Sequence, residues 1–245
     1  MTPRLRLGML TPSSNTVLEP VTTAMLAGLP ETSAHFGRFR VTEIALTDNA
    51  LAQFDLSGIL SAAELLSHAR CQVIAWNGTS SGWLGFETDL RLCEAIAQRT
   101  GALACTSVLA LNEIMEKTGV RRFGLVSPYR DDVQAAIIAN YARAGYDCVA
   151  ERHLGHQDNF SFSEVSADEI RQMVREVMNV PAEKRPEAVA IFCTNLSGAP
   201  LVAELEQAFG VPVYDTIATV VWKSLRLAGV DTRRITGWGS LMALQ

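Results

Sequence analysis

The chain has 245 residues, 48% of them hydrophobic and 19% charged, with a formal net charge of −5. That is ample for a packed core, and the absence of a basic stripe argues against nucleic acid as a partner. No apolar run approaches the length of a membrane span, and residues 1–6 lack the apolar stretch of a signal peptide. Five cysteines without a CxxC pair fit reduced thiols in a cytoplasm, and with only four scattered histidines we expect no metal site.

Short apolar runs alternate with longer stretches of helical periodicity. The predicted strands are residues 5–10, 41–46, 73–76, 102–105, 123–126, 149–153, 188–192 and 211–214. The predicted helices are residues 17–29, 59–69, 88–99, 108–117, 131–144, 167–178, 200–209 and 217–227, and residues 179–185 are polar and predict a loop. Strands that alternate with helices predict an α/β fold with parallel sheets flanked by helices.

The chain also repeats itself. RLGMLTP at 6–12 matches RFGLVSP at 122–128, and IAWNGTS at 74–80 matches VAIFCTN at 189–195. A third pair, GALACT at 101–106 and GVPVYDT at 210–216, follows in the same order. A repeat of this length is domain-sized. The sequence therefore predicts two pseudo-symmetric α/β subdomains, residues 1–115 and 116–225, with residues 226–245 packing back on the first.

Polar clusters follow four of the predicted strands, at residues 11–15, 77–81, 127–129 and 193–195. Ligands of open α/β sheets bind outside the carboxyl ends of the strands. We therefore expect the two halves to face each other, with these loops lining an active-site cleft. In the aligned repeat Gly78 stands opposite Cys193, so such a cleft would hold one thiol rather than two.

With these motifs in view, the chain resembles the cofactor-independent Asp/Glu racemase superfamily, in the branches of maleate cis-trans isomerases and arylmalonate decarboxylases. LTPSSNT at 10–16, SPY at 127–129 and the strand end at Cys193 are similar to the isomerase branch. GTS at 78–80 is similar to the decarboxylase branch, where a glycine replaces the first cysteine. The resemblance implies a cytoplasmic enzyme without a cofactor, acting on a small carboxylic or dicarboxylic acid and, by analogy, assembled from identical subunits.

The resemblance implies four catalytic residues: Cys193, Thr79, Ser80 and Tyr129. Cys193 would act as acid, base or nucleophile, with its pKa lowered by the N-terminus of a following helix; a buried apolar cysteine is the alternative. Thr79 and Ser80 would hold a carboxylate and then the oxygens of an enediolate, although these residue types also cap helices. Tyr129 would donate to the same oxygens, or only pack its ring.

Further residues are expected to contact the substrate without reacting: Pro12, Ser14, Asn15, Gly78, Asn159, Thr194 and Asn195. Asn15 would bind a second carboxylate or cap a helix, and the backbone after Cys193 would complete an anion nest. Asn159 lies in a long polar loop that suits a lid. Trp83 and Phe86 would line an apolar pocket or pack between helices, whereas Cys105 and the histidines are weaker candidates.

A single thiol favours some reactions over others. Racemisation is simplest with two opposed acid/base groups, whereas decarboxylation of a malonate-type diacid needs one proton donor. The decarboxylase interpretation therefore leads. A maleate-isomerase-like reaction with Cys193 as nucleophile, a racemase with another second base, and a non-catalytic dicarboxylate-binding protein remain as alternatives.

Overall fold

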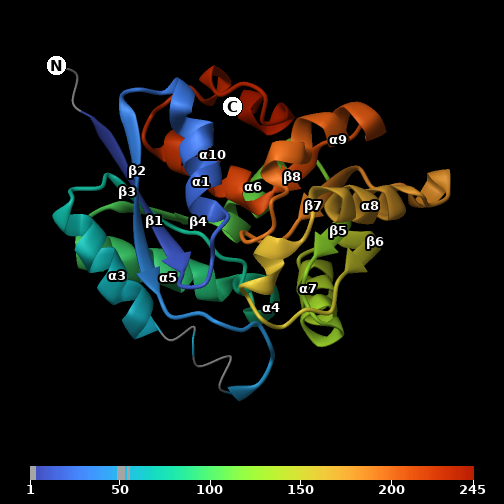
Figure 1. Ribbon diagram of the computed structural model, residues 1–245, viewed down its shortest axis with the longest axis horizontal. Helices are drawn as coiled ribbons and strands as arrows, with labels where there is room; N and C mark the ends of the chain where they lie inside the picture. The colour runs from blue at the N-terminus through green and yellow to red at the C-terminus, as the bar shows by residue number, and fades with distance from the viewer. Residues whose placement is uncertain (1–3, 49–52, 54–55) are drawn as a thin grey trace.

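The computed structural model describes residues 4–48, 53 and 56–245, which form two four-stranded parallel sheets (Figure 1). The first has the order β2-β1-β3-β4 and the second β6-β5-β7-β8, so both halves share one topology and the predicted fold class is confirmed. The strands are β1 (Leu5–Pro12), β2 (Thr32–Phe39), β3 (Val73–Trp76), β4 (Leu103–Thr106), β5 (Arg122–Ser127), β6 (Asp147–His153), β7 (Ala188–Ile191) and β8 (Val213–Asp215).

Helices flank both sheets. They are α1 (Leu18–Met25), α3 (Leu56–His68), α4 (Ser81–Leu84), α5 (Glu87–Thr100), α6 (Ser107–Thr118), α7 (Asp131–Arg143), α8 (Ala167–Met178), α9 (Val202–Phe209) and α10 (Thr216–Leu227). Short 3₁₀ turns cover Leu26–Gly28, Ser161–Glu164, Ala182–Lys184, Ala199–Leu201, Thr232–Arg234 and Ser240–Ala243. Within the described part of the chain, none of the helices is both long and apolar enough to cross a membrane.

The central strands are apolar because helices cover both of their faces. Leu7, Met9 and Leu10 of β1 are fully buried, as is Leu125 of β5. The second strand was predicted wrongly. It is Thr32–Phe39, a half-exposed edge strand with polar residues, whereas residues 41–46 form a loop. Val41, Ile44 and Ala45 of that loop are buried although its backbone is irregular, so its hydrophobicity does not mark a strand.

Helix α4 holds the two halves together. Asn140 of α7 donates to the backbone oxygens of Ser81 and Gly82 at 3.1 and 3.2 Å. Gly82 also lies against the Phe192 ring, where a Cβ atom would come within 2.6 Å. The first turn of α4 is therefore placed directly against the second half.

The C-terminal part of the chain contacts both halves. Helix α10 packs on α6 and reaches β3 and β4 of the first sheet, and Figure 1 shows it beside α1. Beyond α10, Arg234 pairs with Glu31 of the first half, while the Ser240 hydroxyl donates to Glu206 of the second at 2.8 Å. The proposed subdomain boundaries at residues 115 and 225 remain a prediction.

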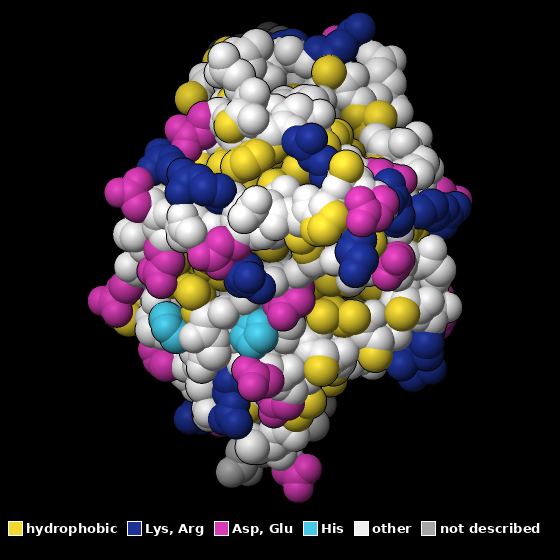
Figure 2. Space-filling model, turned by 90° about the vertical axis from the view of Figure 1, so that its right-hand side faces the viewer, with side chains coloured by type: hydrophobic (Ala, Val, Ile, Leu, Met, Phe, Trp, Pro, Cys, Tyr) yellow, Lys and Arg dark blue, Asp and Glu magenta, His cyan; other side chains and the backbone are white. Residues whose placement is uncertain are grey.

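The face of the molecule in Figure 2 carries acidic and basic side chains side by side. Several of the ion pairs are exposed, for example Arg152 with Glu176 and Arg171 with Glu204. Exposed pairs of this kind contribute little to stability individually. The core, rather than the surface charges, therefore carries the stability of the fold.

Asp215 caps α10 from a fully buried position. Its Oδ1 accepts from the backbone N–H groups of Ile217 and Ala218 at 2.8 and 3.3 Å. Burial nevertheless raises the pKa of Asp215 to about 7, well above the ~3.9 of an aspartate in an unfolded chain. Between these two values the folded protein holds a proton that the unfolded chain has lost, so the free energy of unfolding falls as pH rises from 4 to 7.

We expect Asp215→Asn to weaken this pH dependence, because asparagine keeps a capping oxygen without a charge. At pH 8 the variant should be more stable than the wild type by roughly 1–4 kcal/mol. Urea unfolding at several pH values measures the difference. Asp215→Ala is the matched control, since it loses the cap and should be less stable than Asp215→Asn at every pH. An unchanged pH profile in Asp215→Asn would contradict the assignment.

Candidate active site

Cys193 lies just beyond the end of β7 and is 3% exposed. The backbone N–H of Asn195 donates to its sulfur at 3.3 Å. Burial raises the pKa of the thiol to about 12, although the Tyr129 hydroxyl and nearby backbone N–H groups act in the opposite direction. The expectation of a lowered pKa was wrong, because the next α-helix, α9, begins only at Val202. Cys193 is therefore a protonated thiol at neutral pH.

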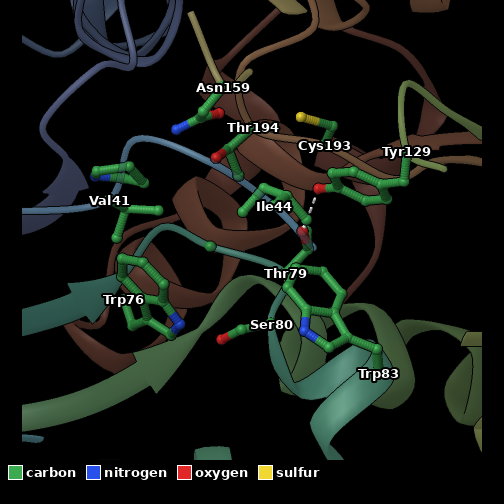
Figure 3. Close-up of a pocket in the computed structure, with 12 residues that line it drawn as sticks. Val41, Ile44, Trp76, Thr79, Ser80, Trp83, Tyr129, Asn159, Cys193 and Thr194 are labelled. Atoms are coloured by element: carbon green, nitrogen blue, oxygen red, sulfur yellow. Dashed lines mark hydrogen bonds between the residues drawn. The ribbon is translucent and has the colours of Figure 1, made fainter. Parts of the chain in front are cut away.

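Thr79, Ser80 and Tyr129 all line the same pocket, with the Ser80 hydroxyl pointing toward its Trp76 side (Figure 3). The Thr79 and Tyr129 hydroxyl oxygens lie 2.6 Å apart, and Figure 3 shows the Tyr129 hydroxyl pointing at Thr79. Ser80 occupies the N-cap position of α4 but makes no side-chain capping bond. Burial raises the pKa of Tyr129 well above its ordinary value, so its hydroxyl also stays protonated. These hydroxyls form a neutral, hydrogen-bonding wall.

The pocket between the two halves has a cavity volume of only about 20 Å³ in this structure. Ligand pockets usually measure ~300–1,000 Å³, so this one is nearly closed. Its lining combines the polar wall with an apolar one and contains no Lys, Arg or His among the described residues. The full set is Pro12, Val41, Ile44, Trp76, Gly78, Thr79, Ser80, Trp83, Tyr129, Asn159, Cys193 and Thr194.

Two loops, one from each half, meet beside the pocket. The Ile44 N–H donates to the Gln157 oxygen at 2.9 Å, and the Asn159 N–H donates to the Thr42 oxygen at 3.0 Å. These contacts bring Val41 and Ile44 of one loop and Asn159 of the other, which are far apart in the sequence, to the same pocket. In this structure the loop that carries Asn159 is fastened to the opposite half.

Three of the predicted binding residues do not line the pocket. Asn15 caps α1 through Oδ1, which accepts from Val17 and Leu18, and its Nδ2 donates to the Thr194 oxygen at 2.9 Å. Asn195 Oδ1 accepts from the Thr16 N–H at 3.0 Å. Ser14 donates to the Val41 oxygen at 2.8 Å. Asn15 and Asn195 thus join the two halves, and Ser14 does so by accepting from Asn159 Nδ2 at 2.9 Å.

Sequence reasoning missed Val41, Ile44 and Trp76 as lining residues, because each sits in a segment that was interpreted as a strand. Trp83 does line the pocket and packs edge-on against Tyr129, with ring centroids 5.3 Å apart. Phe86 instead packs against Tyr141, at 5.0 Å. Cys105 also lies outside, with its sulfur 3.4 Å from the Ser224 hydroxyl oxygen.

Comparisons with known proteins agree with this arrangement. A model of the arylmalonate decarboxylase family matches residues 11–242. A maleate isomerase of Geobacillus stearothermophilus is 26% identical over 253 residues and covers 99% of each chain. An arylmalonate decarboxylase of Bordetella bronchiseptica is 25% identical over 187 residues, 76% of this chain and 77% of that protein.

Solved structures of the same enzymes share the fold. A Nocardia farcinica maleate cis-trans isomerase, a cysteine-to-serine mutant with a covalently bound succinylcysteine intermediate, matches with a TM-score of 0.87 at 23% identity, covering 97% of this chain and 98% of that one. A double mutant of arylmalonate decarboxylase, with a glycine changed to cysteine and a cysteine to serine, matches with a TM-score of 0.85 at 22% identity, covering 97% and 98%.

The junction between the halves can be tested at Asn15. Aspartate keeps the capping oxygen but places a second acceptor opposite the buried Thr194 oxygen, in place of a donor. We expect Asn15→Asp to lower the free energy of unfolding by about 1–3 kcal/mol at pH 7, as measured in urea. At pH 4 a protonated aspartate can donate again, so the deficit relative to the wild type should shrink. A deficit that does not depend on pH would contradict this role.

Proposed function

The chain belongs to the arylmalonate decarboxylase family, and from this premise we propose that it decarboxylates a malonate-type dicarboxylic acid without a cofactor. The family places it among isomerase and lyase enzymes. The observation that carries the finer proposal is the single buried thiol of the pocket. Gly78 is the residue that aligns with Cys193 in the repeat, and it supplies no second acid or base. Decarboxylation needs one proton donor, whereas proton exchange between two faces is simplest with two.

The polar wall would hold the carboxylate that remains on the product. Thr79 and Ser80 would donate to its oxygens, and these bonds strengthen as charge develops there in the enediolate. The Tyr129 hydroxyl has one proton, so it serves one acceptor at a time. We propose that it donates to the enediolate first and to the Cys193 sulfur after proton transfer, since that interaction lowers the pKa of the thiol.

The apolar wall would surround the carboxylate that leaves. Pro12, Val41 and Ile44 offer it no hydrogen bond from their side chains, and none of the described lining residues carries a positive charge. A carboxylate is poorly solvated in such surroundings, whereas CO₂ is neutral. Breaking the bond between the α-carbon and this carboxyl group leaves the electron pair on the enediolate. Cys193 then gives its proton to the α-carbon, and the resulting thiolate regains a proton from solvent.

Maleate isomerisation is the second candidate, because full-length similarity extends to maleate isomerases such as that of Geobacillus stearothermophilus. In that reaction a thiolate adds to the double bond, the carbon–carbon bond rotates, and the thiolate leaves. Cys193 would have to be the nucleophile. A pKa of about 12 leaves it protonated at neutral pH, which favours the donor role over the nucleophile role.

Proton NMR in D₂O separates these reactions. The substrates are methylmalonate, phenylmalonate, maleate, and D- and L-aspartate. We expect loss of CO₂ from a malonate with one deuterium on the α-carbon, and at least a ~100-fold slower reaction in Cys193→Ala. Cys105→Ala removes a buried thiol outside the pocket and serves as the matched control. Conversion of maleate to fumarate without decarboxylation would overturn the proposal, and binding without any product would favour the non-catalytic alternative.

The pH dependence gives an independent prediction. A donor whose pKa is about 12 is protonated throughout pH 8–10, so kcat/KM for decarboxylation should be flat across this range. This window lies above the pKa of the neighbouring Asp215, about 7. A thiolate nucleophile would instead make the rate rise about tenfold for each pH unit, because the ionised fraction rises tenfold. A steep rise would therefore contradict the donor role.

A further inference from the structure

The backbone conformation at position 78 does not explain why this residue is a glycine. Its φ is not among the positive values found at other glycines of the chain, so an L-residue could adopt its conformation. The obstacle is the Trp76 ring. A Cβ atom on Gly78 would lie 2.0 Å from Cζ2 of Trp76 and 2.5 Å from both Cε2 and Cη2. The indole thus occupies the space from which a second thiol would act.

Trp76 is held firmly in this place. It ends β3, is 1% exposed, and its ring packs against Phe39 at the end of β2, with ring centroids 5.1 Å apart. Figure 3 shows the indole on the opposite side of the pocket from Tyr129. Its position depends on the first sheet and not on a loop.

A second cavity of about 200 Å³ lies next to the active pocket. It is bounded by helices α3, α4 and α5 and is mostly apolar, with Leu56, Ile59, Leu84 and Leu92 among its lining residues. Trp76 and Ser80 line both this cavity and the active pocket. The indole therefore separates the small active pocket from a larger, mostly apolar space.

We propose that Trp76 determines the substrate specificity of the site. This proposal rests on the proposed function. The indole limits the α-substituent of the acid to about the size of a methyl or ethyl group, and it excludes an aryl group from the apolar cavity. The same ring keeps position 78 free of a side chain and so keeps the site to a single thiol.

Binding of unreactive monocarboxylates tests the size limit without requiring turnover. Propionate and phenylacetate are titrated into the wild type and Trp76→Leu by calorimetry. We expect the affinity ratio of phenylacetate to propionate to rise at least ~10-fold in Trp76→Leu, since a phenyl ring then gains a buried apolar site. Trp76→Phe should raise the ratio less and provides a milder change if Trp76→Leu does not fold.

Trp222→Leu is the matched control. Trp222 is fully buried, lies outside the pocket, and donates through Nε1 to the Leu244 oxygen at 3.0 Å. It should lose stability without a change in the affinity ratio. A ratio that stays constant in Trp76→Leu and Trp76→Phe would overturn the proposal. Turnover of methylmalonate by the wild type is measured separately. If the wild type does not decarboxylate methylmalonate but the affinity ratio of phenylacetate to propionate shifts in Trp76→Leu, the proposed decarboxylation is rejected and the specificity role of Trp76 is retained.

The steric pairing of Trp76 with Gly78 can be tested by a double-mutant cycle in thermal unfolding. Gly78→Ala adds only the Cβ atom and should lower the Tm of the wild type by roughly 3–8 °C. In the Trp76→Leu background the same change should lower the Tm by less than ~2 °C, because the ring is gone. Equal losses in the two backgrounds would show that something other than the indole excludes a side chain at position 78.

Discussion

Burial of the Cys193 sulfur between the two halves is the constraint on which the chemistry of this protein depends. The pocket around it has polar hydroxyls and apolar side chains, and its described lining includes no basic residue. In such surroundings the charged thiolate is disfavoured, and the pKa of the thiol rises to about 12. A thiol in this state stays protonated, so it can still protonate an enediolate, which is a much stronger base, but it acts poorly as a resting nucleophile.

The duplication of the fold explains how such a pocket forms. Equivalent strands of the two sheets end at the cleft, so Trp76 and Gly78 of one half face Cys193 of the other. Buried contacts at Asn15 and Asn140 keep the halves together, and each involves a side chain that donates to the backbone of the opposite half. The halves have nevertheless diverged at the chemically decisive position. A bulky indole and a glycine stand where a second acid/base group would otherwise be expected.

The fold and the polar half of the site were predictable from the sequence, because they depend on local patterns. Cys193, Thr79, Ser80 and Tyr129 follow predicted strands, and the structure brings them to one pocket. The apolar half was not predictable. Val41 and Ile44 lie in a loop that faces inward and is as hydrophobic as a strand. Asn15 donates to the Thr194 oxygen of the other half, and this contact exists only once the two halves are packed together. The pKa of Cys193 was misjudged since it depends on burial and on the distance to α9.

The most direct test of a single buried proton donor is the stereochemistry of the product. Decarboxylation of 2-ethyl-2-methylmalonate yields 2-methylbutanoate, whose α-carbon becomes chiral when the proton arrives. Delivery from Cys193 alone reaches one face of the enediolate, so chiral chromatography should find one enantiomer in large excess. A racemic product would mean that the proton comes from solvent or from both faces, and would contradict the role assigned to Cys193.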